Sequence, residues 1–224
     1  MELMEAMKLR HSVRMYTGQS LGAEVLDALR EEINACNREG GLHIQLVTDE
    51  PKAFDSFMAH YGKFSGVRNY IALIGEKCPR LEEKCGYYGE RLVLRAQQLG
   101  LNTCWVAMTY KKIPGAFEVR RGEKLTVVLA LGYGAVQGAE HKSKPAERVS
   151  NLDAASPEWF RAGVEAALLA PTAMNQQKFF LRYADGRVAA KAGTGFYTKI
   201  DLGIAKYHFE LGAGKDFSVW NEND

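Results

Sequence analysis

Three polar side chains alternate near the start of the chain, within the segment KLRHSVRMYTG. Arg10, Ser12 and Arg14 are two residues apart, and an extended backbone directs such residues to one side. Guanidinium groups bind phosphate or carboxylate through paired hydrogen bonds and stay charged at any relevant pH, while a serine hydroxyl adds a compact donor. The spacing therefore indicates a clamp for a phosphate or a carboxylate. Solvated surface arginines after a helix are the alternative interpretation.

A second candidate lies in the segment EAALLAPTAMNQQKFF, where a helix is expected to end at Pro171. The loop that follows carries Thr172 and Asn175 and leads into a predicted strand. A carboxamide offers both a donor and an acceptor, which match the mixed edge of a flavin or another heteroaromatic ring. Capping of the loop by these two side chains is the alternative.

A third candidate is the polar segment AEHKSKPAER, which contains Lys142 and Lys144. Ammonium groups have the right charge to bind a phosphate tail. Lysines in such a run more often serve only to keep a surface soluble.

These segments resemble two signatures of the flavin-dependent nitroreductase family. RHSVRMYTG is similar to the family's opening pattern R-x-S-x-[RK]-x-[FY], and APTAMNQQKFF is similar to its second signature, A-P-S-A-x-N-x-Q-P-W. The stretches LRAQQLGLNTCWVAMTY and LTVVLALGYG are also similar to a helix-strand unit and to the last core strand of that family. The resemblance therefore covers most of the chain.

The resemblance implies a binding site for flavin mononucleotide (FMN). Arg10, Ser12 and Arg14 are then expected to contact the flavin phosphate and the pyrimidine edge of the ring, with the backbone of His11 beside them. The other implied contacts are Lys142 and Lys144 at the phosphate, Pro171, Thr172 and Asn175 on the other side of the ring, and Ala107 and Met108 near its reactive nitrogen.

The sequence departs from the family pattern at several positions. The second signature lies in the C-terminal half instead of closely following the first, which resembles a divergent nitroreductase branch with the same order. Lys178 and Phe179 replace the usual proline and tryptophan, and Ala107 and Met108 replace a common Glu-Gly pair.

The apolar spacing predicts alternating helices and strands. Ser156 is expected to cap one helix, with Pro157 at its first position, and Asp185-Gly186 is expected to form a hairpin turn. Gly40-Gly41 is expected to stop an earlier helix. Helices are predicted at 2–9, 23–36, 88–99, 159–170 and 201–211, an extended segment at 10–16, and strands at 42–47, 70–75, 103–108, 125–133, 178–183 and 187–192.

The resemblance implies an α+β fold with a nitroreductase-like, mixed and mainly antiparallel sheet flanked by helices. We expect an N-terminal half at 1–134, a connecting segment at 135–156 and a C-terminal half at 157–224 that completes the flavin site. A helix, a loop and a strand recur at 23–47 and 157–183, so an internal duplication remains open.

Composition limits the partners of the chain. Its 29 basic and 27 acidic side chains are mixed along 224 residues and give a net charge of +2, which favours neither nucleic acid nor an anionic membrane as a partner. The four cysteines form no close pair, and the histidines show no metal-ligand spacing. The N-terminal segment carries charges and does not read as the apolar core of a signal peptide. We therefore expect a cytoplasmic protein with reduced thiols and no metal site.

The resemblance implies an FMN-dependent oxidoreductase that transfers electrons from NADH or NADPH to a nitroaromatic compound, a quinone or a similar small acceptor by a ping-pong mechanism. No catalytic side chain is expected, because the flavin carries the chemistry. Family members bind flavin at a dimer interface, so a homodimer or a pseudo-dimeric monomer is expected. A flavin-storing or flavin-consuming protein and a non-enzymatic nucleotide- or phosphate-binding module are the alternatives.

Overall fold

The computed structural model describes residues 1–221. The chain divides into two compact units. Unit 1 comprises Met1–Lys8, Glu82–Arg91 and His141–Asp224, and unit 2 comprises Leu9–Leu81 and Leu92–Glu140. Each unit has its own sheet, and each is described by itself below.

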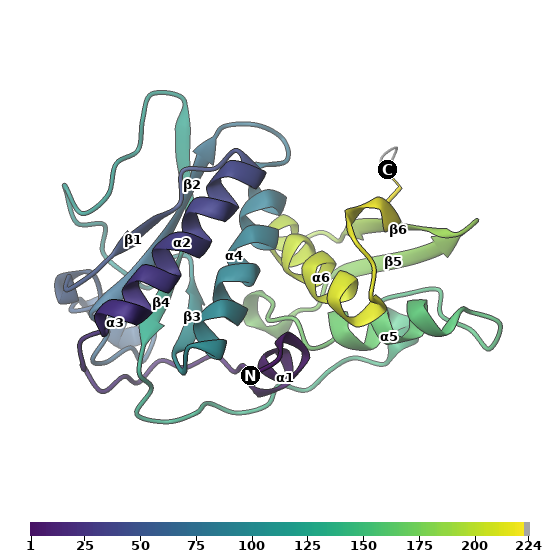
Figure 1. The fold of residues 1–224 in the computed structure, drawn as a ribbon, viewed down its shortest axis with the longest axis horizontal. Helices are drawn as coiled ribbons and strands as arrows, with labels where there is room; N and C mark the ends of the chain where they lie inside the picture. Colours follow the sequence, from purple (N-terminus) through teal and green to yellow (C-terminus); the bar gives the residue numbers. More distant parts are fainter. Residues whose placement is uncertain (222–224) are drawn as a thin grey trace. The chain divides into compact units, whose positions relative to one another are not determined.

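Unit 2 contains a four-stranded antiparallel sheet (Figure 1). The strand order is β1-β2-β4-β3, so β2 and β4 are central and pair along their whole length. Strand β2 is buried from Asn69 to Gly75 and β4 from Val127 to Gly132, and these stretches are almost entirely apolar, as expected for strands covered on both faces. The bounds are Gln45–Val47 for β1, Asn69–Glu76 for β2, Asn102–Val106 for β3 and Glu123–Gly132 for β4.

Helix α2 (Ala23–Gly40) runs across one face of this sheet (Figure 1). It ends where the sequence predicts, because Gly41 adopts the left-handed conformation with φ of 60° and donates its N–H to the carbonyl of Asn37. The Asn37 carboxamide then exchanges two hydrogen bonds with the backbone of Ile44, at 2.7 and 3.0 Å. The end of α2 thereby fixes the approach to β1.

An aromatic cluster fills the core of unit 2 beside the short helices η1 (Pro51–Ala53) and α3 (Phe57–Tyr61). The ring of Phe54 lies 5.2 Å from that of Phe64 and 6.0 Å from that of Tyr70, between centroids. Such pairs add stability beyond the apolar area that they bury. The cluster gives the loops around α3 a rigid base.

Unit 1 is built from helices α5 (Glu158–Ala167) and α6 (Thr198–Ala213) and the hairpin of β5 (Phe179–Ala184) and β6 (Arg187–Ala192), as Figure 1 shows. The hairpin turn is confirmed. Asp185 and Gly186 have φ angles of 50° and 81°, which the tight turn between two twisted strands requires. Helix α1 (Leu3–Leu9) belongs mostly to this unit.

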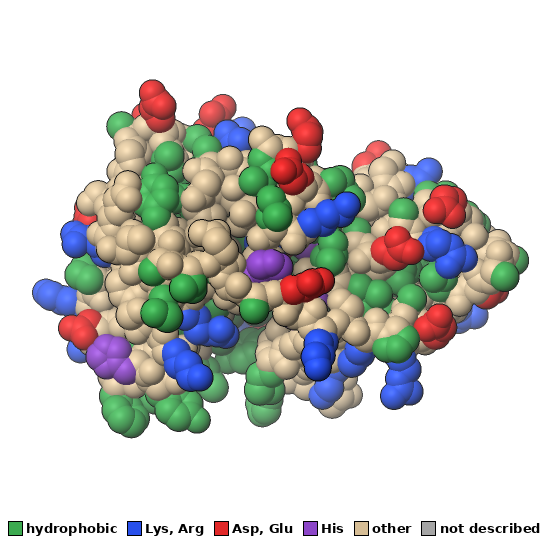
Figure 2. All heavy atoms as spheres, turned by 90° about the horizontal axis from the view of Figure 1, so that it is seen from below, with side chains coloured by type: hydrophobic (Ala, Val, Ile, Leu, Met, Phe, Trp, Pro, Cys, Tyr) green, Lys and Arg blue, Asp and Glu red, His purple; other side chains and the backbone are tan. Residues whose placement is uncertain are grey.

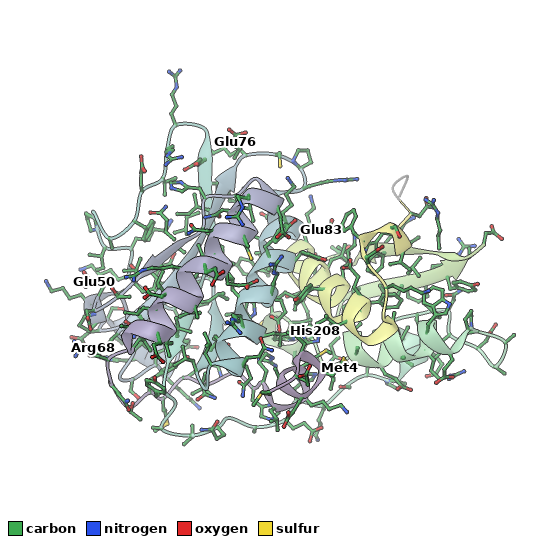
Figure 3. All side chains as sticks on the ribbon, in the orientation of Figure 1. Met4, Glu50, Arg68, Glu76, Glu83 and His208 are labelled. Atoms are coloured by element: carbon green, nitrogen blue, oxygen red, sulfur yellow. The ribbon has the colours of Figure 1, made fainter. Side chains whose placement is uncertain are left out.

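Helix α4 (Leu81–Gln98) contributes its residues Glu82–Arg91 to unit 1, where they pack on α6. Gly203 of α6 approaches the backbone of Glu83 and Tyr87 so closely that no side chain fits between them. Polar pairs flank this contact: Lys206 lies 2.8 Å from Glu83, and the buried His208 lies 2.9 Å from Glu90. Figure 3 labels Glu83 on α4 and His208 on α6.

Several predicted boundaries were wrong. Ser156 does not cap α5, because its hydroxyl exchanges hydrogen bonds with Asp153, and Pro157 takes the capping position. Strand β3 ends at Val106, so Ala107 and Met108 lie beyond it, and β1 starts only at Gln45. Helix α4 begins at Leu81, well before the predicted start, and α5 ends at Ala167.

Charged side chains of both signs are interspersed on the face drawn in Figure 2. This distribution agrees with the near balance of 29 basic and 27 acidic side chains in the sequence. Within residues 1–221, none of the helices has the length and apolar character that spanning a bilayer requires.

The close contact between α4 and α6 gives a stability prediction. Gly203→Ala places a methyl group against the backbone of Glu83 and 2.7 Å from the nitrogen of Tyr87, so we expect a loss of about 2 kcal/mol in the free energy of unfolding. Urea unfolding of the purified variant measures this loss. Lys199→Ala, at an exposed site on the same helix, is the control and should change the free energy by less than about 0.5 kcal/mol. Equal stability of the two variants would contradict the packing described here.

Candidate functional site

The segment that carries the first motif is extended, as predicted, and is held by backbone hydrogen bonds within unit 2. The N–H of Val13 donates to the carbonyl of Thr103 at 3.0 Å, and the N–H of Tyr16 donates to that of Ser65 at 2.9 Å. Ser12 also forms a parallel bridge with Thr103 in β3. The segment therefore lies against β3 with a fixed alternation of its side chains.

Tyr16 anchors the end of this segment in the core. Its hydroxyl donates to the carbonyl of Val13 at 2.8 Å, and the carbonyl of Ala130 lies 3.4 Å away. Burial raises the pKa of Tyr16 well above its usual value, so the phenol remains neutral. A neutral buried hydroxyl with acceptors in the backbone fixes the segment without adding a charge.

The predicted trio Arg10, Ser12 and Arg14 lies near enough to Cys104 in β3 to affect the pKa of its thiol. Burial raises the pKa of this thiol, while the charges of Arg14 and Arg10 and a side-chain hydrogen bond with Ser12 lower it. Alternation along the extended segment places the three side chains on one side. Arg10 is 4% exposed, Ser12 is partly buried, and Arg14 is exposed.

A pocket of about 380 Å³ opens in unit 2 beside Arg14. Its volume is typical of a site for a small ligand. The guanidinium carbon of Arg14 lies 6.0 Å from the centroid of the Phe64 ring, within the range of a cation-π contact. None of the described residues that line the pocket is acidic. They are Arg14, Tyr61, Gly62, Lys63, Phe64, Trp105, Val106, Ala107 and Thr109.

The turn after α3 shapes one wall of this pocket. Lys63, just after α3, adopts a left-handed conformation with φ of 62°, and the neighbouring Gly62 packs tightly on Thr109, where an added Cβ would lie 2.8 Å from the threonine Cβ. Ser56 caps α3 by accepting the N–H of Ala59 at 3.3 Å. The turn after α3 and the end of β3 thus meet at the pocket.

The structure brings Arg14 and Ala107 together in this pocket, although they come from separate predicted motifs. Met108 is 68% exposed and is not among the lining residues. His11 lies partly buried against Gly138, where an added methyl group would be 2.8 Å from its Cβ.

In unit 1, the second and third candidate segments are joined by hydrogen bonds. The side-chain amide of Asn175 donates to the carbonyl of Lys142 at 2.9 Å, and that of Gln177 donates to the same carbonyl at 2.8 Å. The ammonium of Lys144 donates to the carbonyls of Gln176 and Gln177, at 2.6 and 3.1 Å. The two segments therefore form one structure.

Thr172 and Asn175 also stabilise their own loop, which follows Pro171. The Thr172 hydroxyl accepts the N–H of Gln177 at 3.0 Å, and the Asn175 carboxamide oxygen accepts the side-chain amide of Gln177 at 2.8 Å. These bonds correspond to the loop-capping role that was the alternative for both residues. Their contact with a ring stays a prediction.

Several residues of these two regions were not predicted from the sequence. Tyr61 and Lys63 come from a polar stretch without a clear period, and Trp105 was recognised only as part of a strand. In unit 1, Gln177 and Asp201 hold the loop by hydrogen bonds, and neither was predicted to do so.

Comparison with known proteins identifies the family. The family model described as "Putative TM nitroreductase" matches residues 2–213. A solved structure described as a putative nitroreductase from Thermotoga maritima is 24% identical, with a TM-score of 0.65 over 95% of this chain and 83% of that chain. At this identity the structural likeness shows the fold alone. No match was found among curated proteins.

Two further solved structures share the fold over a smaller part of this chain. One is described as a putative nitroreductase in complex with FMN from Desulfovibrio desulfuricans; it is 14% identical, with a TM-score of 0.52 over 70% of this chain and 99% of that chain. The other, a nitroreductase family protein from Clostridium difficile, is 18% identical, with a TM-score of 0.52 over 67% and 98%. The predicted fold of mixed helices and antiparallel strands is confirmed, and because the family model spans most of the sequence, this protein belongs to the nitroreductase family.

Proposed function

We propose that this protein is an FMN-dependent oxidoreductase that accepts electrons from NADH or NADPH and passes them to a small electron-poor acceptor, such as a nitroaromatic compound or a quinone. The observation that carries the proposal is that Arg14 and Ala107, from two separate family segments, line one pocket with aromatic side chains. The Desulfovibrio structure with the same fold is described as an FMN complex, which supports the choice of cofactor.

The residues present in unit 2 fit FMN by their chemistry. Two guanidinium groups and a hydroxyl lie near Cys104, and such a donor set suits a phosphate. Aromatic side chains line the adjoining pocket, which suits a planar ring. When bound, FMN supplies a ring that accepts and donates hydride equivalents, so the chain needs no nucleophile and base pair.

The protein's proposed contribution is to bind FMN, to orient the acceptor and to tune the electronic properties of the flavin ring. Arg10, Ser12 and Arg14 hold the phosphate and the pyrimidine edge, with the backbone of His11 beside them. A guanidinium at that edge stabilises the negative charge of the reduced ring. Because burial raises the pKa of Cys104, its thiol stays protonated and adds no negative charge beside the anion.

The end of β3 forms the other part of the pocket. Ala107 has a small side chain, which leaves room for a ring, and the backbone N–H of Met108 is proposed to hydrogen-bond its reactive nitrogen. Phe64 and Trp105 line this side of the pocket and are proposed to shield a bound ring from water. Orientation of the acceptor and exclusion of water are therefore roles of this wall.

Unit 1 supplies the second proposed set of contacts, on the basis of the family motif. Pro171, Thr172 and Asn175 are proposed to approach the ring, and Lys142 and Lys144 the phosphate. Two carbonyls already accept hydrogen bonds from the Lys144 ammonium, which leaves one of its three donors for an anion.

The arrangement of the motifs bears on assembly and location. One chain carries both signatures, so we propose a homodimer or a pseudo-dimeric monomer, with the N-terminal half at 1–134 and the C-terminal half at 157–224 supplying one signature each. Within residues 1–221, none of the four cysteines forms a disulfide bond, which supports the proposed cytoplasmic location.

Loss of the two arginines tests the phosphate site. The absorbance spectrum of the purified protein after addition of FMN and removal of the excess should retain the flavin bands, and Arg10→Ala/Arg14→Ala should lose them. Charge-assisted hydrogen bonds contribute about 1.5–3 kcal/mol each, so we expect a rise of about 100-fold or more in Kd by fluorescence titration. Arg30→Ala/Arg38→Ala, which removes two exposed arginines from α2, is the matched control.

Unchanged affinity in the folded Arg10→Ala/Arg14→Ala variant would contradict the phosphate site. A wild-type protein that binds no FMN would contradict the proposed cofactor. Wild type that binds FMN but never reduces a nitroaromatic or a quinone with NADH or NADPH would indicate flavin storage instead of catalysis.

The size of residue 107 tests the pocket. Ala107→Leu fills part of the space beside Arg14, so FMN affinity should fall at least about tenfold, equivalent to about 1.4 kcal/mol. Met108→Leu alters an exposed side chain that does not line the pocket and should bind FMN as wild type does. Fluorescence titration of both variants measures the difference, and equal affinities would place the ring elsewhere.

A further inference from the structure

A buried carboxylate in unit 1 holds the loop that carries the second motif. Asp201, in the first turn of α6, is 2% exposed. Its Oδ1 accepts the backbone N–H of Ala173 at 2.9 Å, and its Oδ2 accepts the side-chain amide of Gln176 at 2.7 Å. Each carboxylate oxygen therefore fixes a different part of the loop.

The loop needs such a restraint, because its backbone is strained. Met174, Asn175 and Gln177 have φ angles of 50°, 53° and 43°, in the left-handed region that side chains disfavour. Strained residues persist only where their surroundings over-determine the conformation, and they concentrate at functional sites. Asp201 supplies two of the hydrogen bonds that determine it.

Gln176 connects this carboxylate to a second turn. Its Nε2 donates to Oδ2 of Asp201 and, at 2.8 Å, to the carbonyl of Phe196. Two acceptors thus fix one amide group. A protonated carboxyl is a weaker acceptor than a carboxylate and carries a donor of its own, so protonation weakens the hydrogen bonds from Gln176 and Ala173 that hold the loop.

No charged side chain in residues 1–221 forms an ion pair with Asp201. The charged and titratable groups of the loops around Asp201 have other partners or are exposed. Lys144, Lys178 and His141 each contact a backbone carbonyl, those of Gln176 and Gln177, of Thr194 and of Leu168 respectively. Lys142 and Lys199 are exposed, and Tyr197 occupies the capping position of α6. Protonation of Asp201 is therefore not held off by a nearby cation.

We propose that Asp201 is a positioning residue for the second motif, and that its protonation releases Gln176, loosens the loop at Pro171–Gln177 and weakens FMN binding in mildly acidic solution. The link to FMN rests on the proposed function, whereas the change in the loop does not. In this proposal Asp201 acts through Ala173 and Gln176 and contacts neither the flavin ring nor the electron acceptor.

The relevant range of pH follows from the burial of Asp201. Burial raises the pKa of Asp201 to about 6, while the hydrogen bonds from Ala173 and Gln176 lower it in part. The unfolded chain releases this proton near pH 4, so between pH 4 and 6 the folded state binds more protons than the unfolded state does. This residue therefore does not destabilise the fold as pH falls through 6, and a loosened loop is separable from acid unfolding.

Amide resonances of the flavin-free protein test the change in the loop. In a pH series of ¹H–¹⁵N spectra, the backbone amide of Ala173 and the side-chain amide of Gln176 should shift together with a midpoint near pH 6. Asp201→Asn, which imitates the protonated form, should abolish this titration. Asp153→Asn is the matched control, because Asp153 also accepts a backbone N–H and a hydroxyl but is exposed.

Gln176→Ala provides a second variant that leaves the carboxylate in place. It removes one hydrogen bond that favours the charged form, so the Ala173 midpoint should move to higher pH. An Ala173 amide that does not titrate near pH 6 in wild type, or that titrates equally in Asp201→Asn, would overturn the proposal.

FMN titrations at pH 5 and pH 7.5 test the link to the cofactor. The FMN phosphate itself gains a proton near pH 6, so the comparison is between variants. Wild type should lose at least about fivefold more affinity on acidification than Asp201→Asn, whose affinity at pH 7.5 should already be reduced. Equal losses would overturn the link, and absence of FMN binding at both pH values would overturn the proposed function while the amide titration still decides the loop.

Discussion

The candidate site depends on the backbone hydrogen bonds that hold residues 10–16 extended between β3 and the segment at Ser65. Val13 and Tyr16 donate to Thr103 and Ser65, and Val13 is buried on the side opposite to the polar trio. Because side chains alternate along an extended segment, a slip of one residue would bury Arg14 and expose Val13. The apolar residue thus fixes the register, and the register presents the two guanidinium groups and the serine on one side. The chemistry of the site is a consequence of that packing.

The aromatic core of unit 2 also supports the pocket. Phe64 belongs to the aromatic core and contacts Arg14, so the wall of the pocket continues into the rigid interior of unit 2. The loop of unit 1 is built differently. Met174 and Asn175 in this loop are exposed, and the backbone is strained at Met174. Hydrogen bonds to Asp201 and to the carbonyl of Lys142 hold the loop. Of the two proposed sets of contacts, the first is fixed by apolar packing and the second by hydrogen bonds that respond to protonation.

The features predicted correctly from sequence are those with a local physical cause. Gly41 ends α2 because it tolerates a positive φ, and Asp185-Gly186 makes the hairpin turn for the same reason. Ser156 also has a local preference for capping, but Asp153 competes for its hydroxyl. The pocket residues Tyr61 and Lys63 could not be predicted, because only the tertiary approach of Gly62 to Thr109 brings them there. The roles of Arg14 and Ala107 came from a family resemblance, and the fold then placed both in one pocket.

A crystal structure of the protein grown with FMN tests whether the cofactor binds at Arg10, Ser12 and Arg14. We predict density for the phosphate within hydrogen-bond distance of Arg10, Ser12 or Arg14, and density for the ring against Ala107 and Trp105 in the pocket of unit 2. Density for FMN at another site, with the Arg14 pocket filled only by solvent, would contradict the account.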